Sequence, residues 1–191
     1  VRHFGWHGHQ LRAHRGSQPT RPCGRSRDGE ELHDRVRQDV DLRQDPPRDQ
    51  PDLLREIYAG FLSVADCPII TIAGVNGAAV GAGMNLALAC DIRIVTTRAK
   101  FEARFTKLGI HCGGGHTFLL RRYLNWQQSI ASLILGKSIR GDKAVAMGLA
   151  LDCVEEEELE AACMSICEDI RLIPRQLLED TKKSLAAANA A

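Results

Sequence analysis

A glycine-rich turn between two apolar segments is the part of this sequence best suited to chemistry. Three glycines occur within residues 77–83, between the β-branched run 69–75 and the apolar run 82–90. The first run predicts a buried strand and the second a helix. The amino terminus of a helix exposes unpaired backbone N–H groups and carries a partial positive charge. The backbone N–H of Ala82 could therefore bind an anion or stabilise a developing oxyanion.

A polar side chain follows this turn on the predicted helix. Asn85 comes three residues after Ala82, so the two residues share one helix face. An amide cannot act as a general base near pH 7, but it can hold a water or a carbonyl by hydrogen bonds. Two interpretations stay open: Asn85 contacts a ligand, or it is a tolerated polar residue in a buried helix.

A second candidate cluster lies in the glycine-rich run 109–116, which contains His111, Cys112 and His116. A Cys–His pair could supply a nucleophile, but nothing in the sequence predicts a stabilised thiolate. The ligand number and the spacing do not fit a metal site, and we expect no metal. We favour a loop beside an apolar pocket.

Residues 76–91 resemble the hallmark of the crotonase family, the enoyl-CoA hydratase/isomerase group. The family pattern N-G-x-A-x-G-G-G, followed by a short apolar helix and C-D, stands here as NGAAVGAG and Cys90-Asp91. The segments AKFEARFTKLGIHCGGGHTFLLRRYLN and LILGKSIRGDKAVAMGLALDCV match the family in order and spacing. The resemblance covers roughly residues 53–185.

The resemblance implies an α/β fold, a crotonase-like spiral of ββα turns with C-terminal helices. It also implies that the chain binds an acyl-CoA or enoyl-CoA thioester and stabilises the thioester enolate between two backbone N–H groups, one of them at Ala82. Gly81, Gly83, Gly113 and Gly114 are the substrate-binding residues that it implies. Coenzyme A enters as part of the substrate, and no separate cofactor is expected.

The two carboxylates of the family's hydratases are absent from the matched positions, which are Asn85 and Phe105. Hydration needs one group to deprotonate water and another to deliver a proton. Glu102 could substitute for the missing acid, but we favour a solvated charge near the start of a helix over residues 102–108. Phe105 predicts an apolar wall for an acyl chain.

The sequence also predicts roles for an aspartate and two lysines, and further helices and strands around these segments. We expect Asp91 to be structural rather than catalytic, either capping or pairing with Arg93 or with a neighbouring chain. Lys182 and Lys183 lie where family members often place a basic residue near the CoA phosphates, although exposed lysines are the interpretation that we favour. Helices are predicted over 52–65, 117–124, 127–135, 143–147, 159–170 and 175–188, and strands over 92–95 and 149–154.

Composition limits the class of protein. The chain has 191 residues and a net charge of +1, which does not indicate a nucleic-acid partner. We see no run typical of a signal peptide or a membrane span, and we expect a cytoplasmic protein whose seven cysteines stay reduced.

The first fifty residues differ from the rest. They contain ten Arg, no Lys and five of the seven His, and no run alternates as a strand does. Acidic residues interleave with the Arg, which argues against a nucleic-acid arm. We expect a disordered segment or a reading frame out of register over 1–50, followed by a crotonase-like acyl-CoA-binding domain over 51–191. The N-terminal strands of the family, and the loop A-F-x-A-G-x-D that supplies the first oxyanion N–H, would then be missing or replaced.

Several functions stay open. The first is an enoyl-CoA hydratase/isomerase family enzyme, a lyase or isomerase of fatty acid metabolism. The second is a catalytically inactive acyl-CoA binding or carrier protein. A subunit that serves only assembly, as the family's homotrimers or dimers of trimers suggest, and the inactive product of a damaged gene are the others.

Overall fold

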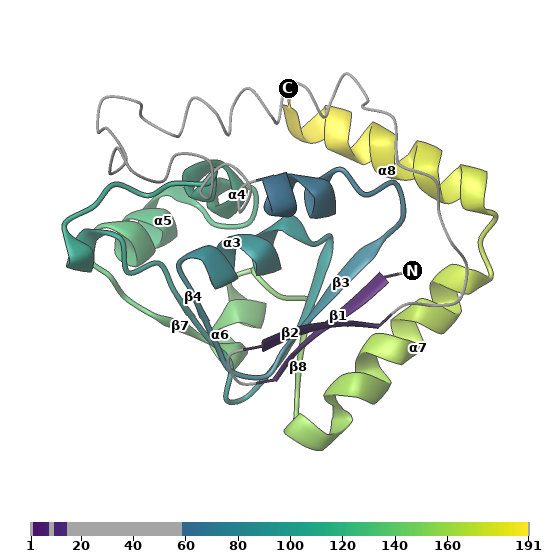
Figure 1. The fold of residues 1–191 in the computed structure, drawn as a ribbon, viewed down its shortest axis with the longest axis horizontal. Coiled ribbons are helices and arrows are strands. Elements are labelled where there is room, and N and C mark those ends of the chain that lie inside the picture. The colour runs from purple at the N-terminus through teal and green to yellow at the C-terminus, as the bar shows by residue number, and fades with distance from the viewer. Residues whose placement is uncertain (1, 8–9, 15–58, 191) are drawn as a thin grey trace.

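The computed structural model describes residues 2–7, 10–14 and 59–190, which form a mixed α/β fold with two sheets (Figure 1). The strands are β1 (Arg2–His7), β2 (Gln10–His14), β3 (Thr71–Val75), β4 (Ala78–Val80), β5 (Ile92–Thr96), β6 (Lys100–Glu102), β7 (Ile139–Arg140) and β8 (Asp152–Val154). The α-helices are α3 (Ala82–Ala89), α4 (His116–Arg121), α5 (Trp126–Leu133), α6 (Gly141–Ala146), α7 (Leu159–Arg171) and α8 (Arg175–Ala190). Residues 59–65 are also helical, and short 3-10 helices span Thr106–Leu108 and Glu156–Glu158.

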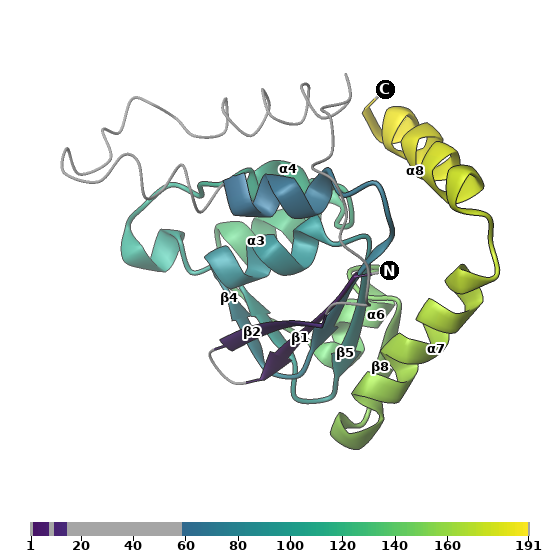
Figure 2. The same cartoon turned by 45° about the vertical axis from the view of Figure 1, so that its right-hand side comes forward.

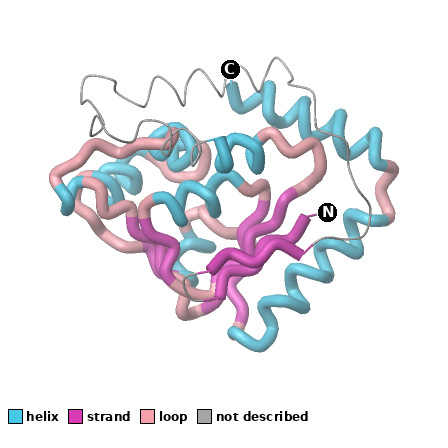
Figure 3. The backbone as a smooth tube through the Cα atoms, viewed as in Figure 1, coloured by secondary structure: helices cyan, strands magenta, loops and turns pink. Residues whose placement is uncertain are grey.

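The larger sheet has the strand order β2-β1-β3-β5-β8, and the smaller has the order β4-β6-β7. Figure 3 shows the strands of the two sheets in magenta. In the larger sheet β3 pairs in parallel with β1 and β5, β5 pairs in parallel with β8, and β2 pairs antiparallel to β1. The turn after β3 moves the chain from the larger sheet to β4 in the smaller one. The segment that contains the candidate site therefore connects the two sheets.

Strand β3 is buried on both faces, which explains why its sequence reads as one apolar run. On one face Ile72 packs with Leu159 and Cys163 of α7. On the other face Ala73 and Val75 belong to the cluster that contains α3. Figure 2 shows α7 and α3 on opposite sides of the larger sheet. Packing on both faces of the sheet thus fixes the position of the glycine turn that follows β3.

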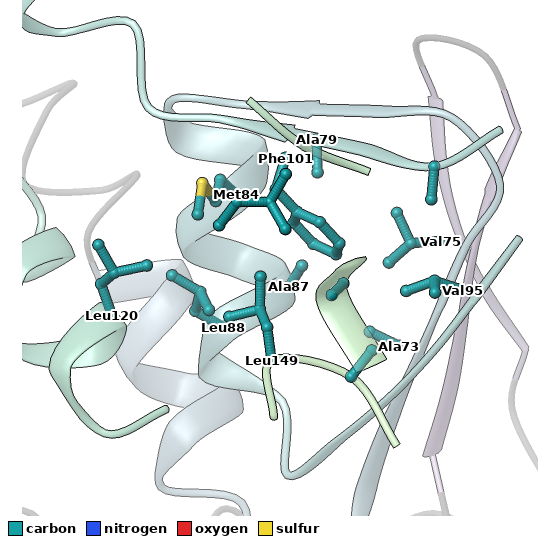
Figure 4. Packing of buried hydrophobic residues seen from close by; sticks show 14 of the residues in the cluster. Ala73, Val75, Ala79, Met84, Ala87, Leu88, Val95, Phe101, Leu120 and Leu149 are labelled. Atoms are coloured by element: carbon teal, nitrogen blue, oxygen red, sulfur yellow. The ribbon is translucent and has the colours of Figure 1, made fainter. Parts of the chain in front are cut away.

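The main hydrophobic core lies between α3, the larger sheet and the smaller sheet (Figure 4). Met84 and Leu88 of α3 have no exposed surface, and Phe101 of β6 and Leu120 of α4 are equally buried. Burying one such side chain stabilises a fold by about 1.5–3 kcal/mol. This packing holds the helix whose amino end carries the candidate site.

Arg93 completes the other end of α3. Its side chain is 3% exposed, and its Nη1 donates to the backbone oxygens of Cys90 at 2.7 Å and Ala87 at 3.1 Å. Its Nε donates to the backbone oxygen of Leu149 at 2.6 Å. A cation suits the carboxyl end of a helix, where carbonyls lack partners. Arg93 thus fixes the end of α3 and does not form the predicted ion pair with the Asp91 side chain.

Asp91 has the structural role expected of it, but its ion-pair partner is Lys182 of α8, which corrects the expected partner of Asp91 and the expected exposure of Lys182. Lys182 Nζ lies 2.6 Å from Asp91 Oδ2 and donates to the backbone oxygens of Cys67 at 2.7 Å and Ile69 at 3.2 Å. Asp91 Oδ2 also accepts from the backbone N–H of Thr71 at 2.7 Å. Lys182 is therefore neither an exposed lysine nor free for a CoA phosphate. It joins α8 to the start of β3.

The N-terminal part of the chain differs from its prediction where it is described. Strands β1 and β2 lie within residues 2–14, so the expectation that no run there forms a strand is wrong. Residues 15–58 are outside the described part, and with them most of the segment expected to be disordered or out of frame. The predicted helix over 52–65 is described only over 59–65.

The other predicted helices and strands are present with shifted boundaries, except for one predicted helix close to the candidate site. The helix predicted over 102–108 is wrong: Glu102 ends strand β6, and only Thr106–Leu108 form a short 3-10 helix. The strand predicted over 149–154 is limited to Asp152–Val154.

The ion pair of Lys182 leads to a stability prediction. Lys182→Met should lower the free energy of unfolding by about 1–3 kcal/mol, because it removes a charged donor from a carboxylate and two carbonyls. The neighbouring Lys183 is the matched control, since its side chain is 55% exposed and its Nζ lies 3.9 Å from Asp180. Lys183→Met should change stability by less than about 0.5 kcal/mol. Equal losses in urea denaturation of the two variants would contradict the structural role of Lys182.

Candidate functional site

The turn between β4 and α3 needs glycine at one position. Gly81 has φ 52° and ψ −114°, a left-handed conformation that side chains rarely adopt. Its N–H donates to the backbone oxygen of Glu102 at 3.0 Å, which ties the turn to β6. The bend at Gly81 is as predicted, but the turn predicted over residues 77–83 also contains strand β4, Ala78–Val80. The conformation of Gly81 sets the direction in which α3 begins.

The amino end of α3 has no internal cap. The N–H of Asn85 donates to the oxygen of Gly81 at 3.1 Å, so the N–H groups of Ala82, Gly83 and Met84 precede the first helical bond. Among the described residues none of these three groups has a hydrogen-bond acceptor. The first turn of α3 has no acidic side chain, and Gly81 provides no side-chain cap. The positive end of the helix dipole is thus left available to a ligand.

Asn85 connects α3 to the glycine-rich loop that precedes α4. Its side chain is buried, and its Nδ2 donates to the backbone oxygens of Gly113 at 3.0 Å and Gly114 at 3.4 Å. Its Oδ1 is hydrogen-bonded to Nδ1 of His116. Asn85 is therefore not an idle polar residue, because its amide joins two segments. The carbonyls of Gly113 and Gly114, both predicted substrate-binding residues, face this amide.

His116 lies at the first position of α4 and has no exposed surface. Because Asn85 Nδ2 is used by two carbonyls, Asn85 Oδ1 faces the ring and can only accept. Nδ1 of His116 must then carry the proton, and Nε2 keeps its lone pair. Nε2 is buried and has no hydrogen-bond partner among the described residues. Burial lowers the pKa of His116 to about 4, so the ring is neutral at pH 7.

Phe105 packs against the same histidine. The two ring centroids are 5.1 Å apart and the rings meet edge to face at 65°. The two positions matched to the family's carboxylates, Asn85 and Phe105, therefore both contact His116. Sequence reasoning considered His116 as a partner for Cys112 or as a metal ligand and missed this arrangement. A signal was available, because His111 and His116 are the only histidines after residue 50.

The Cys112–His116 pair considered from the sequence is not formed. Cys112 Sγ lies 3.0 Å from the hydroxyl oxygen of Thr117, whereas Nδ1 of His116 is taken by Asn85. Elsewhere in the core, burial raises the pKa of the Cys90 thiol to about 12 and that of Cys163 to about 11. These two thiols stay protonated at pH 7 and cannot serve as thiolate nucleophiles.

Glu102 is not the solvated charge expected from the sequence. It is 3% exposed at the end of β6, and its carboxylate lies 2.8 Å from Lys100 Nζ, 3.0 Å from Lys107 Nζ and 3.1 Å from Arg104 Nε. The hydrogen bonds from Lys100 and Lys107 are the largest causes that lower its pKa to about 2. A carboxylate held ionised in this way cannot deliver a proton near pH 7, so it does not replace the missing acid.

Arg104 stands where the family motif has proline. Its φ is 62°, the one positive φ among the described non-glycine residues. Proline fixes φ near −65° and could not adopt this conformation. The backbone just before Phe105 therefore differs from that of any chain with proline at the matched position.

Residues 2–7, 10–14 and 59–190 contain no group of three or more His, Cys, Asp or Glu side chains placed to hold a metal ion. Within the same ranges, no helix combines the length and the apolar character that crossing a membrane requires.

The sequence is similar to that of a known protein family and to those of several curated proteins. The family model described as enoyl-CoA hydratase/isomerase matches residues 38–190. A probable enoyl-CoA hydratase of Mycobacterium tuberculosis (strain H37Rv) is 44% identical over 138 residues, which are 72% of this chain and 53% of the relative. The (E)-benzylidenesuccinyl-CoA hydratase of Thauera aromatica is 34% identical over 113 residues, 59% of this chain and 44% of the relative. The chain thus spans about half the length of these curated relatives.

Solved structures of proteins named as enoyl-CoA hydratases or isomerases are similar to this chain in fold. A probable enoyl-CoA hydratase/isomerase from Mycobacterium abscessus superposes with a TM-score of 0.69 at 30% identity, covering 72% of this chain and 52% of the other. A protein from Thermobifida fusca YX, solved in complex with CoA, gives a TM-score of 0.68 at 29% identity, covering 73% of this chain and 56% of the other. The crotonase-like fold expected from the sequence is confirmed.

The buried neutral His116 leads to a pH prediction. Its pKa is about 4 in the folded chain and about 6.5 when unfolded, so the unfolded chain binds more protons between these values. Acidification from pH 6.5 towards 4 should therefore cost up to about 3 kcal/mol through this residue. Urea denaturation across this range should show a steeper loss for the native chain than for His116→Gln. The exposed His111 is the control, and His111→Gln should keep the native slope. Parallel curves for the native chain and His116→Gln would contradict the burial of a neutral ring.

Proposed function

The chain belongs to the enoyl-CoA hydratase/isomerase family, and from that premise we propose that it binds an acyl-CoA thioester with the thioester carbonyl at the amino end of α3. The proposal includes stabilisation of the thioester enolate by the backbone N–H of Ala82. Complexes of similar T. fusca proteins with CoA and with acetoacetyl-CoA support this class of ligand.

The uncapped amino end of α3 is the observation that carries the proposal. Three successive N–H groups precede the first helical bond, and no acidic side chain of the first turn neutralises them. Ala82 is exposed and Gly83 is half-buried, so neither backbone position is covered by core. A carbonyl oxygen that gains negative charge would be stabilised there by the N–H groups and the helix dipole.

The surroundings of this end suit an acyl thioester. His116 is neutral, Asn85 is neutral, and Phe105 contributes an apolar ring. A binding pocket of mostly apolar walls with a few polar groups is typical of small-molecule sites. Substrate contacts of Gly81, Gly83, Gly113 and Gly114 belong to this proposal. For the last two they would have to involve groups other than the carbonyls that face Asn85.

A carrier that binds acyl-CoA without turnover is the second candidate. It is favoured by Asn85 and Phe105 at the two matched positions, because neither side chain can exchange a proton near pH 7. A carrier needs only backbone donors and an apolar surface for the acyl chain. Both candidates therefore share the same binding proposal and differ in whether any proton moves.

Assembly as a homotrimer or a dimer of trimers is a further part of the proposal, as is the expected cytoplasmic location. Leu172, Leu177 and Leu185, at the end of α7 and on α8, are 80%, 56% and 65% exposed. Apolar side chains gathered along one end of a chain support a protein–protein contact there.

The binding proposal can be tested by removing one donor. Ala82→Pro deletes the N–H at the first position of α3, where proline fits a helix, and should weaken crotonyl-CoA binding by about 10-fold or more. Ala82→Ser keeps the backbone donor and should bind within about threefold of the native chain. Isothermal titration calorimetry gives both affinities, and thermal unfolding checks that each variant is folded.

The reference ligand is free coenzyme A, which lacks the thioester carbonyl. Its affinity should be the same for Ala82→Pro and the native chain. Absence of binding to any acyl-CoA by the native chain, or unchanged crotonyl-CoA affinity in Ala82→Pro, would overturn the proposal.

A further inference from the structure

One buried ring nitrogen has no hydrogen-bond partner in the part of the chain that the structure describes. Nε2 of His116 is enclosed, carries a lone pair and finds no donor among the described residues. Leaving a buried acceptor unpaired costs about 1–3 kcal/mol. A structural histidine would normally satisfy both nitrogens, so this atom is suited to a group that the protein does not itself contain.

The ring is held in one orientation and one tautomer. Oδ1 of Asn85 accepts a hydrogen bond from Nδ1 of His116. The Asn85 amide cannot flip by 180°, because its Nδ2 donates to the backbone oxygens of Gly113 and Gly114. A base whose other nitrogen is fixed by a hydrogen bond is the arrangement found in catalytic histidines. The role of orienting group is here taken by a neutral amide.

The location connects this nitrogen to the proposed carbonyl site. Asn85 lies one helical turn after Ala82, on the same face of α3, and Phe105 covers an edge of the His116 ring. The Asn85–His116 pair thus stands next to the helix end that would hold the thioester oxygen. The histidine also contacts both residues that occupy the positions of the family's carboxylates.

Resting on the proposed function, we propose that His116 is a catalytic residue whose Nε2 takes the proton from the α-carbon of the bound thioester, with Asn85 as its positioning residue. The α-carbon–hydrogen bond breaks, and the proton forms a new bond to Nε2. The electron pair of the broken bond moves into the enolate, whose oxygen is held by the N–H of Ala82. Nε2 then exchanges this proton with solvent, and return of a solvent-derived proton to the α-carbon restores both partners, so no oxidant or reductant is needed.

The electrostatics suit this step. At pH 7 the ring is neutral, so the accepting form is present in every molecule. The pKa of His116 is lowered by burial alone, without a contribution from a charged side chain. Proton transfer creates an imidazolium beside an enolate, and the attraction between the two opposes the desolvation that otherwise disfavours the charged ring.

The reaction class that follows is enolisation rather than water addition. Removal and return of a carbon-bound proton require one base, whereas hydration also requires a group that activates water. Glu102 is not available for that second task, because its carboxylate is held by three cations. The chain should therefore exchange α-protons of saturated acyl-CoA thioesters.

The test uses butyryl-CoA in D₂O, a thioester that cannot be hydrated. Mass spectrometry of the acyl group should show deuterium incorporation with the native chain. His116→Gln should reduce the exchange rate at least about 100-fold while butyryl-CoA affinity stays within about threefold. His111→Gln, in the exposed part of the same loop, should exchange at the native rate.

The outcomes separate this inference from the binding proposal. Butyryl-CoA binding without exchange in the native chain, or native exchange in His116→Gln, would overturn the role of His116 and leave binding intact. Absence of binding in the native chain would instead remove the proposed function.

A measurement on the native chain covers the case in which His116→Gln does not fold. Nitrogen-15 NMR of labelled histidine should show His116 protonated at Nδ1, with the Nε2 signal shifting when butyryl-CoA is added. A proton on Nε2, or no change on addition, would overturn the inference.

Discussion

The candidate site depends on one buried amide. Asn85 joins α3 to the loop before α4 through two carbonyls and the His116 ring, which lies 31 residues away in sequence. Both polar atoms of the amide are hydrogen-bonded, and these hydrogen bonds offset the free-energy cost of burying a polar group. An ionised carboxylate at this position could not donate to the two carbonyls, so the amide joins the helix to the loop and carries no negative charge. The neutral state of His116 is compatible with this, since burial is the cause of its lowered pKa and no charged side chain contributes.

The rest of the fold holds the two ends of α3. Gly81 sets the amino end through its left-handed conformation, and Arg93 satisfies carbonyls at the carboxyl end. Buried Met84 and Leu88 fix the helix against both sheets. A helix fixed at both ends and along its length can present backbone donors in one direction. That preorganisation is what makes hydrogen bonds effective in stabilising charge that develops during a reaction.

The sequence was most informative where structure is local. The strand Thr71–Val75, the turn at Gly81 and the helix from Ala82 follow from apolar runs and glycines that are neighbours in the chain. The pairing of Lys182 with Asp91 joins positions 91 residues apart, and periodicity contains no signal for it. Glu102 was misread for a different reason: its cationic partners Lys100, Arg104 and Lys107 are near neighbours in the sequence, but its burial in β6 depends on tertiary packing. His116 was missed because its partner lies on another helix.

The central claim is that the thioester carbonyl binds at the amino end of α3. A crystal structure of the chain with acetoacetyl-CoA tests it most directly. The account predicts the thioester oxygen within about 3 Å of the Ala82 nitrogen, with the α-carbon facing Nε2 of His116. A thioester oxygen bound away from the amino end of α3, with Nε2 facing protein atoms alone, would contradict it.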